Sequence, residues 1–408
     1  MSTFTVPYPD GLPIGEGWVD CPDHQKIAFP YDGSLVADSP VGSVDHARRA
    51  LDAAAAVRSE MAALSTGARR ALLMAIHSAL DEHGPELIEL LILETGKPRV
   101  DCTTELARSL TTWAASAEEV AHTHGETVPL DLQPLGEGMI GYWTRRPAGV
   151  VVGITGFNYP LLLASHKLAP ALAAGCPIIV KPAPNTPLAS LWAVHLIRQV
   201  LSSHGVSASA VQLVTGGVEV GACLVADPRT AVVSFTGSAA VGHQIARDAA
   251  PRKTVLELGS NAALIVAGDA VIADAVDAVI RGGFYANGQA CISVQRIVLV
   301  ESIAEEFEQA LMARMGEVRV GDPREESTRV APVINEASSR RIIGWIDAAV
   351  KDGARLLCGG TETGRSIEPT VMGELPDDAE LWCEEIFGPV VCLRRVPDVE
   401  TAIGLVNQ

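Results

Sequence analysis

Cys291 is a candidate nucleophile. It follows Asn287-Gly288-Gln289-Ala290, which we interpret as a flexible lead-in to an apolar segment. The thiolate form of a cysteine can attack a carbonyl carbon and form a covalent intermediate. A single cysteine is more often an inert thiol of the core, and for Cys291 taken alone this alternative is favoured.

Glu257 is a candidate general base. It lies in the apolar run Val255-Leu256-Glu257-Leu258-Gly259, for which the pattern predicts a strand. Burial there would raise the pKa of the carboxyl group toward neutrality unless the group were paired, and such a group suits proton abstraction near pH 7. A buried salt bridge is the alternative, slightly favoured in isolation.

Asn158 is a candidate oxyanion donor, because it follows an apolar strand and precedes a helix. A carboxamide donates a hydrogen bond to developing negative charge without titrating itself. Taken alone, the residue is explained better as a helix N-cap.

Three further segments carry candidate binding groups, and two of them suit an anionic ligand. Lys181 ends a strand and is followed by a proline; it either points at a phosphate or ribose or is an exposed terminal charge, with equal weight. Phe235-Thr236-Gly237-Ser238 opens a helix whose free N–H groups form an anion site, although its glycine spacing is not that of a dinucleotide fingerprint. Glu384-Glu385 precedes Ile386-Phe387-Gly388-Pro389, for which a solvated turn is the alternative.

These groups need a scaffold, and the segment from residue 142 to 255 supplies one. Strand-like and helix-like runs alternate there, which predicts a parallel, doubly wound sheet with ligands at the carboxyl ends of its strands. The expected strands are 149–154, 177–181, 211–215 and 232–235, and the expected helices are 160–174, 188–201, 218–225 and one after Ser238.

The remaining chain predicts a second α/β unit, an arm and an N-terminal helical part. From the pattern we expect a domain boundary near residue 255, a first domain of residues 1–124 and 142–255, an extended arm at 125–141 and a second domain at 256–408. The expected N-terminal helices are 44–57, 66–95 and 101–122. In the second domain the strands are 254–258, 262–266, 294–300 and 389–393, and the helices are 269–285, 303–315 and 336–352.

Composition excludes several classes of protein. With 408 residues the chain should hold two or three domains, and its net charge of −18 without a basic cluster argues against nucleic acid or an anionic membrane as partner. None of the eight cysteines forms a CxxC pair, so we expect no metal site and reduced thiols, as in a cytoplasmic protein. We see neither a signal peptide nor an apolar run of membrane-spanning length.

Six motifs together resemble the aldehyde dehydrogenase superfamily, in particular the group that oxidises lactaldehyde, succinate semialdehyde and phosphonoacetaldehyde. The resemblance extends from Pro30 to the end of the chain. The motifs are Phe157-Asn158-Tyr159-Pro160, Val180-Lys181-Pro182-Ala183, Phe235-Thr236-Gly237-Ser238, Leu256-Glu257-Leu258-Gly259, Gly288-Gln289-Ala290-Cys291 and Glu384-Glu385-Ile386-Phe387-Gly388-Pro389.

The resemblance implies a fold and a reaction. The fold would be α/β, with a Rossmann-type cofactor domain, an α/β catalytic domain and a protruding oligomerisation arm. The reaction would be NAD(P)-dependent oxidation of a small aliphatic semialdehyde or hydroxyaldehyde to the acid. Cys291 would carry a thiohemiacetal and then a thioester, the Asn158 amide and the Cys291 N–H would hold the oxyanion, and Glu257 would activate water.

The resemblance also implies a cofactor site. Lys181 would bind the adenosine ribose, and Glu385 the nicotinamide ribose. Because Pro184 stands where NAD-preferring members often carry Glu, both NAD and NADP remain open. The full set implied is Ile154, Thr155, Phe157, Lys181, Gly221, Phe235, Gly237, Ser238, Val241, Leu258, Glu385 and Phe387.

For the substrate, the resemblance implies a small aldehyde without a phosphate, since Ala290 replaces the Arg found in members that take phosphorylated aldehydes. Arg108 matches a position that faces the polar end of the substrate in some relatives. The alternative, an ordinary helix charge pair with Glu105, is favoured.

One departure from the family and one alternative chemistry leave other functions open. Relatives continue for several dozen residues beyond Gln408, which implies that the end of the catalytic domain and the strand that pairs subunits are missing. A homodimer or homotetramer is expected, subject to that strand. The alternatives are a non-catalytic dinucleotide-binding protein and a coenzyme A-acylating enzyme, although relatives of the second kind usually lack the Glu at position 257.

Overall fold

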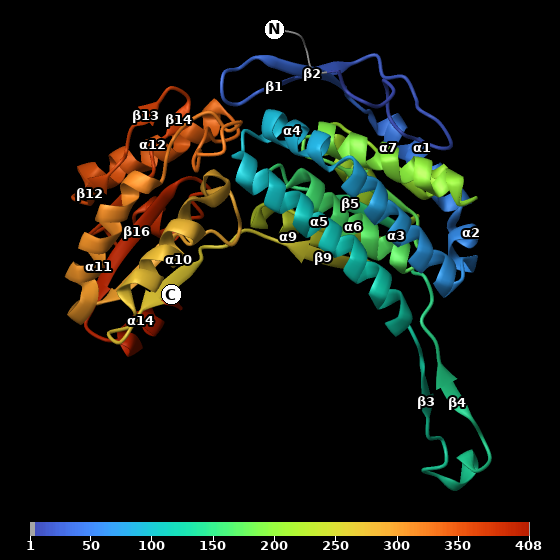
Figure 1. The fold of residues 1–408 in the computed structure, drawn as a ribbon. Coiled ribbons are helices and arrows are strands. Elements are labelled where there is room, and N and C mark those ends of the chain that lie inside the picture. The colour runs from blue at the N-terminus through green and yellow to red at the C-terminus, as the bar shows by residue number, and fades with distance from the viewer. Residues whose placement is uncertain (1–4, 408) are drawn as a thin grey trace.

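Two α/β lobes form an arch in the computed structural model, which describes residues 5–407 (Figure 1). The antiparallel pair β1 (His24–Ala28) and β2 (Leu35–Pro40) runs along the top of the arch, and a hairpin projects from one lobe. Within the described residues, no helix is both long and apolar enough to cross a membrane.

The first lobe is built on a five-stranded parallel sheet. Its strands are β5 (Val150–Ile154), β6 (Ile178–Lys181), β7 (Val211–Leu213), β8 (Thr230–Thr236) and β9 (Lys253–Glu257). They lie in the order β7-β6-β5-β8-β9. The strand order reverses at β5, so the carboxyl ends of β5 and β8 flank the crevice where such sheets bind ligands.

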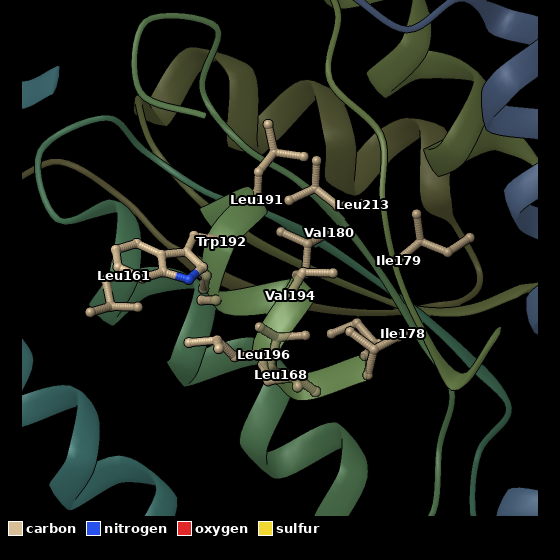
Figure 2. Close-up of a cluster of buried hydrophobic side chains, with 14 of the residues drawn as sticks. Leu161, Leu168, Ile178, Ile179, Val180, Leu191, Trp192, Val194, Leu196 and Leu213 are labelled. Carbon is tan, nitrogen blue, oxygen red and sulfur yellow. The ribbon is translucent and has the colours of Figure 1, made fainter. Parts of the chain in front are cut away.

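Helices cover both faces of this sheet. In right-handed crossovers, α6 (Pro160–Ala173) and α7 (Leu188–Ser203) lie on one face, and α8 (Val218–Ala226) and α9 (Ala239–Ala249) lie on the other beside α1 (Val44–Ala56). Figure 2 shows the packed interior, in which Leu168, Ile178, Val180 and Leu191 meet. The doubly wound sheet expected from the alternation is therefore confirmed.

The N-terminal helices α2 (Arg58–Ala63), α3 (Thr66–Glu82), α4 (Gly84–Thr95) and α5 (Arg99–Glu119) precede the sheet in the chain. The prediction of one helix over residues 66–95 was wrong, because the chain turns at His83 and starts α4 with Gly84-Pro85. A proline has no N–H to continue the hydrogen-bonding of the preceding helix, so it fits the first turn of a new one.

The expected arm is a two-stranded hairpin. β3 (Glu126–Val128) pairs with β4 (Gly141–Trp143), and a 3-10 turn at Pro134–Gly136 lies near its tip. The hairpin extends away from both lobes (Figure 1). Its large apolar side chains are exposed: Val128, Leu130, Leu132, Leu135, Met139, Ile140, Tyr142 and Trp143.

The second lobe has its own five-stranded sheet. Its strands lie in the order β10-β11-β16-β15-β12, and only β12 is antiparallel to its neighbour. The bounds are β10 (Ala263–Val266), β11 (Arg296–Val300), β12 (Arg355–Cys358), β15 (Thr370–Gly373) and β16 (Val390–Val396). A small hairpin of β13 (Glu362–Thr363) and β14 (Ser366–Ile367) precedes β15.

Alternating side chains divide the second sheet between two cores. On β11, Ile297 and Leu299 face one core with α10 (Ile272–Phe284) and α11 (Glu301–Arg314). Val298 between them faces the other core, with α12 (Glu336–Lys351) and α14 (Val399–Val406). The period of two expected of a strand buried on both faces is therefore present.

One strand prediction for this lobe was wrong, and two of its strands were not predicted. The strand expected at 254–258 as the start of the second unit is β9, which pairs with β8 in the first sheet through Thr236 and Glu257. The expected boundary near residue 255 thus falls inside the last strand of the first lobe. Strands β12 and β15 had not been predicted, because they are short and β12 carries an exposed arginine and an exposed leucine.

Two buried carboxylates from the N-terminal helices cap helices of the first lobe. Glu94 of α4 accepts hydrogen bonds from the N–H groups of Leu188 and Ala189, in the first turn of α7, at 2.8 and 3.0 Å. Glu105 of α5 accepts from Leu161 and Leu162 in the first turn of α6, and also pairs with Lys97. Neither helix has a side-chain cap from its own N-cap residue, so the oxygens of these two carboxyl groups accept hydrogen bonds from its free N–H groups.

Burial raises the pKa of Glu94 to about 8, so its proton stays on in the folded protein over a range where the unfolded chain releases it. The contribution of Glu94 to the free energy of unfolding is therefore fully present at acid pH, and it is lost as the pH rises toward 8. One proton corresponds to a slope of about 1.4 kcal/mol per pH unit.

We predict that Glu94→Gln removes this slope, since glutamine does not titrate. Urea unfolding should be measured at pH 5.5, 6.5 and 7.5. The free energy of unfolding of the variant minus that of the wild type should increase at each higher pH, because only the wild type is destabilised by the loss of the Glu94 proton. Glu86→Gln, at an exposed glutamate of the same helix, is the control and should follow the wild type. Parallel pH curves for Glu94→Gln and the wild type would contradict the prediction.

Candidate active site

Cys291 lies in a turn of the second lobe, between α10 and β11. The N–H of Ser293 donates to the carbonyl of Ala290 at 2.9 Å and closes the turn, which follows the 3-10 segment Tyr285–Gly288 and precedes β11. Cys291 is a free thiol and is half-buried, whereas the free thiols of Cys102 and Cys392 are fully buried. Cys291 is therefore not a fully buried thiol of the core, and its reactivity stays a prediction.

The segment before Cys291 is held on all sides. Ala286 and Asn287 take left-handed backbone angles, with φ of 49° and 59°. The Asp101 carboxylate accepts from the Ala286 N–H at 2.9 Å. The buried Asn287 side chain donates to the carbonyls of Gly96 and Pro332 and accepts from the N–H of Ala331. The Gln289 side chain accepts from the N–H of Ile334. The expectation of a flexible lead-in was wrong, because side chains replace the backbone pairing that this loop lacks.

Asn158 comes from the first lobe and reaches the same loop. Its Nδ2 donates to the carbonyl of Gln289, two residues before Cys291, at 2.7 Å. The helix α6 begins at Pro160 with Tyr159 at its N-cap position, so the helix-cap alternative for Asn158 was wrong. A carboxamide has two N–H donors, and the second stays available for a ligand.

Glu257 ends β9 at the crevice. It was expected to be buried or in a buried salt bridge, but it is exposed and forms no ion pair within the described residues. The reason is that β9 is the edge strand of its sheet and its exposed side chains alternate. A general base at this place is in reach of solvent water.

Lys167 is a buried neighbour of Glu257 that the sequence analysis did not single out. Its Nζ donates to the Thr236 hydroxyl at 2.7 Å, and Thr236 is the strand partner of Glu257. Burial lowers the pKa of Lys167 to about 8, and the Glu257 carboxylate partly opposes that shift. A lysine within the otherwise apolar run of α6 was the signal available in the sequence.

Glu385 is packed against a backbone turn opposite Cys291. The Ser260 N–H donates to Glu385 Oε1 at 3.1 Å, and a side chain at Gly259 would collide with the other carboxylate oxygen. Gln295 holds the flanking backbone, accepting from Ile386 N at 2.7 Å and donating to Glu384 O at 2.6 Å. The alternative of a solvated turn was therefore wrong for Glu385.

Arg108 lies on α5 at the other side of the nucleophile loop. Its guanidinium lies 5.9 Å from the centre of the Tyr159 ring. The favoured alternative, a helix charge pair with Glu105, was wrong, because the Glu105 carboxylate is taken by Lys97 and the first turn of α6. The Tyr285 hydroxyl nearby is buried and has no partner within the described residues.

The chain also matches a known protein family over most of its length. Residues 18–408 match the aldehyde dehydrogenase family. The chain belongs to the aldehyde dehydrogenase family. The resemblance and the fold class expected from the sequence are thereby confirmed.

Three relatives show how closely the chain follows the family. It is 33% identical to a 3-sulfolactaldehyde dehydrogenase of Priestia aryabhattai over 100% of this chain and 84% of that protein. A crystal structure of aldehyde dehydrogenase 21 from Physcomitrella patens, in complex with the reaction product succinate, superimposes with a TM-score of 0.93 at 32% identity, covering 99% and 84% of the two chains. A glyceraldehyde-3-phosphate dehydrogenase of Methanocaldococcus jannaschii, complexed with NADP, gives 0.90 at 32% identity, covering 95% and 83%.

The chain is thus an NAD(P)-dependent aldehyde dehydrogenase, and its crevice has free donors that fit a dinucleotide. The Thr155 hydroxyl is buried at the end of β5 without a partner in the described part of the chain. Helix α9 starts after Ser238 without a side-chain cap, so its first N–H groups are free for an anion. Lys181 is only 6% exposed, with Gly221 beside its aliphatic stem, so the alternative of an exposed terminal charge was wrong.

Residues of both lobes also meet in an aromatic pair at this crevice. The rings of Phe157 and Phe387 are 5.6 Å apart and nearly perpendicular. Phe387 has a φ of 53°, which turns its side chain out of the loop that carries Glu385. The other expected cofactor residues line the first lobe around β5, β8 and α9: Ile154, Phe235, Gly237, Val241 and Leu258.

The electrostatics of this aldehyde dehydrogenase disfavour a free thiolate. Burial raises the pKa of the Cys291 thiol, and the carboxylates of Glu385 and then Glu257 raise it further, while the backbone N–H of Cys291 and then Arg108 lower it. The pKa of Glu385 is itself raised by burial. Positive charge or hydrogen-bond donors at the sulfur are therefore needed for it to react at neutral pH.

We predict that Glu385→Gln makes Cys291 ionise at lower pH, because it removes the larger of the two carboxylate contributions. The rate of alkylation of Cys291 by iodoacetamide at pH 7.5, followed by mass spectrometry, should rise several-fold over the wild type. Glu384→Gln, at the exposed neighbouring carboxylate, serves as the control. An unchanged rate for both variants would show that Glu385 exerts no charge effect on the sulfur.

Proposed function

We propose that this chain oxidises a small aliphatic semialdehyde or hydroxyaldehyde to the carboxylic acid, with Cys291 as nucleophile. The observation that carries the proposal is the hydrogen bond from Asn158 to Gln289, because it brings an uncharged donor of one lobe to the nucleophile loop of the other. Acyl chemistry needs these two groups together.

In the first step the Cys291 sulfur forms a bond to the aldehyde carbon, and the carbonyl oxygen gains the electron pair. The second N–H of the Asn158 amide and the backbone N–H of Cys291 stabilise the charge on that oxygen. A loop held by the side chains of Asp101, Asn287 and Gln289 keeps the nucleophile in place, so little reorganisation is needed when the charge develops.

The cofactor would lie in the crevice between the lobes. Lys181 would hold its adenosine ribose, the start of α9 at Gly237 and Ser238 its pyrophosphate, and Glu385 its second ribose, with Phe387 beside the ring. When bound, NAD(P) supplies the acceptor for the hydride that the substrate carbon loses. Pro184 places no carboxylate beside the first ribose, which leaves both NAD and NADP as cofactors.

In the last step Glu257 takes a proton from water, the oxygen of which attacks the thioester carbon, and the Cys291 thiolate leaves. The exposure of Glu257 supports this role, since the carboxylate meets solvent directly. Lys167, bonded to Thr236 beside it, places a basic amino group near this carboxylate.

The substrate would carry a polar or anionic end. Arg108 supports this, because it lies near Tyr159 and Cys291 without a carboxylate partner in the described residues, and the unpartnered Tyr285 hydroxyl offers a second hydrogen-bonding group. A relative named for 3-sulfolactaldehyde and one solved with succinate act on molecules with such an end.

The hairpin β3–β4 would join two copies of the chain into a homodimer or homotetramer. Its exposed apolar side chains, Leu132 at 85% and Leu135 at 88% among them, form a surface of the kind that other chains cover. The cysteines are all unpaired, which supports a reducing compartment such as the cytoplasm.

Glu257→Gln should stop the reaction at the thioester, because glutamine cannot accept the proton of water. Mixing the variant with NAD(P) and aldehyde should give a single burst of NAD(P)H, one per subunit at most, and a mass increase of one acyl group on Cys291. The control is Glu118→Gln at an exposed glutamate near the end of α5. Undiminished steady turnover would refute the role of Glu257, and an acyl-CoA product with added coenzyme A would indicate the acylating alternative.

Arg108→Gln should weaken binding of substrates with an anionic end only. We expect the KM for succinate semialdehyde to rise about 10- to 100-fold, as for a lost charged hydrogen bond, and the KM for butanal to change less than about twofold. Arg70→Gln, at an exposed arginine of α3, is the control. Equal changes for both aldehydes would contradict the assignment of Arg108 to the substrate.

A further inference from the structure

Ser260 connects the nucleophile with the carboxylate on the cofactor side of the crevice. It lies between β9 and β10, where its hydroxyl donates a hydrogen bond to the backbone carbonyl of Cys291. Its own N–H donates to Glu385 Oε1 at 3.1 Å. One residue therefore contacts both groups, through its side chain on one side and its backbone on the other.

The next residue fixes the place of Ser260. The Asn261 amide donates to Trp382 O at 2.8 Å, and its Oδ1 accepts from Gln295 at 3.1 Å. The Arg296 guanidinium donates to the Asn261 carbonyl at 2.8 and 3.2 Å. These bonds fix the backbone at 260–261 to Gln295 and Arg296 at the start of β11 and to Trp382 before Glu385. The backbone of Ser260 is therefore fixed in place where its hydroxyl bonds Cys291.

The turn after Cys291 is closed by the bond from the Ser293 N–H to the Ala290 carbonyl, and the Ser293 hydroxyl donates to the carbonyls of Gly282 and Gly283, but none of these bonds holds the Cys291 carbonyl itself. Ile292 is 63% exposed, so its side chain does not anchor the turn. Within the described residues, Ser260 is the donor to the Cys291 carbonyl. The Cys291 N–H itself donates to no backbone carbonyl there. That N–H is one of the two proposed oxyanion donors, and its direction depends on the backbone angles of Cys291.

We propose that Ser260 is a positioning residue for the reaction: its hydroxyl holds the Cys291 peptide so that the sulfur and the Cys291 N–H point into the crevice. This rests on the proposed role of Cys291 as nucleophile. The hydroxyl acts through the backbone and touches no substrate atom. A loss of position of this kind lowers the rate of the chemical step more than it lowers substrate affinity.

Two variants separate the hydroxyl from the backbone of this residue. Ser260→Ala removes the donor to Cys291 and keeps the N–H to Glu385, and Ser260→Thr keeps both, with room for the added methyl group because Ser260 is exposed. Ser78→Ala is the matched control, because the Ser78 hydroxyl also donates to a backbone carbonyl, that of Met74, on the far helix α3.

For Ser260→Ala we expect kcat to fall about 10- to 100-fold. The KM for the aldehyde and the Kd for NAD(P) should change less than about threefold. Alkylation of Cys291 by iodoacetamide should slow several-fold, measured without cofactor or substrate. Ser260→Thr should restore both rates to within about threefold of the wild type, and Ser78→Ala should leave them unchanged.

Wild-type rates in Ser260→Ala, for turnover and for alkylation, would overturn the proposal. So would equal losses in the alanine and threonine variants, since the hydroxyl would then not be the cause. If the wild type oxidises no aldehyde, the proposed function fails, and the alkylation rates still decide whether Ser260 positions Cys291.

Discussion

The hydrogen bond from the Asn158 amide to the Gln289 carbonyl joins the two halves of this active site. The donor follows the first strand of one sheet, and the acceptor precedes the nucleophile of the other lobe. The distance between the Asn158 amide and the Cys291 sulfur therefore depends on the relative position of the two lobes. The buried Asn287 side chain supports this placement, because it bonds the end of α4 in the first lobe and a loop of the second.

The acidic side chains of this molecule have different roles, and the burial of each side chain determines its role. Glu94 and Glu105 are fully buried and cap α7 and α6, respectively. Glu105 therefore helps to fix the start of α6, two residues after Asn158. Glu385 is half-buried against the backbone of Gly259 and Ser260, close enough to the sulfur to disfavour its ionisation. Glu257 is exposed, where water can reach it. A carboxylate buried without donors would be too costly, and each buried one here has them.

Much of this aldehyde dehydrogenase was predictable from the sequence, because the signals were local. Apolar runs of four to six residues predicted β5, β6 and β8 to within two residues, and helical spacing with a serine cap predicted α1. The family motifs named Cys291, Glu257 and Asn158 as candidates, and the structure brings the loops that carry them to one crevice. The roles of these residues stay predictions.

The sequence by itself determined which segments would form helices and strands, and which residue types could do chemistry. Only the tertiary structure decided the environment of each group. Glu257 is exposed because β9 is an edge strand, and Arg108 has no carboxylate partner within residues 5–407 because Lys97 occupies Glu105. The contact of Ser260 with Cys291 joins residues 31 positions apart. Local periodicity records how one element is buried, whereas ion pairs, edge positions and loop contacts depend on segments that meet only after the chain has folded.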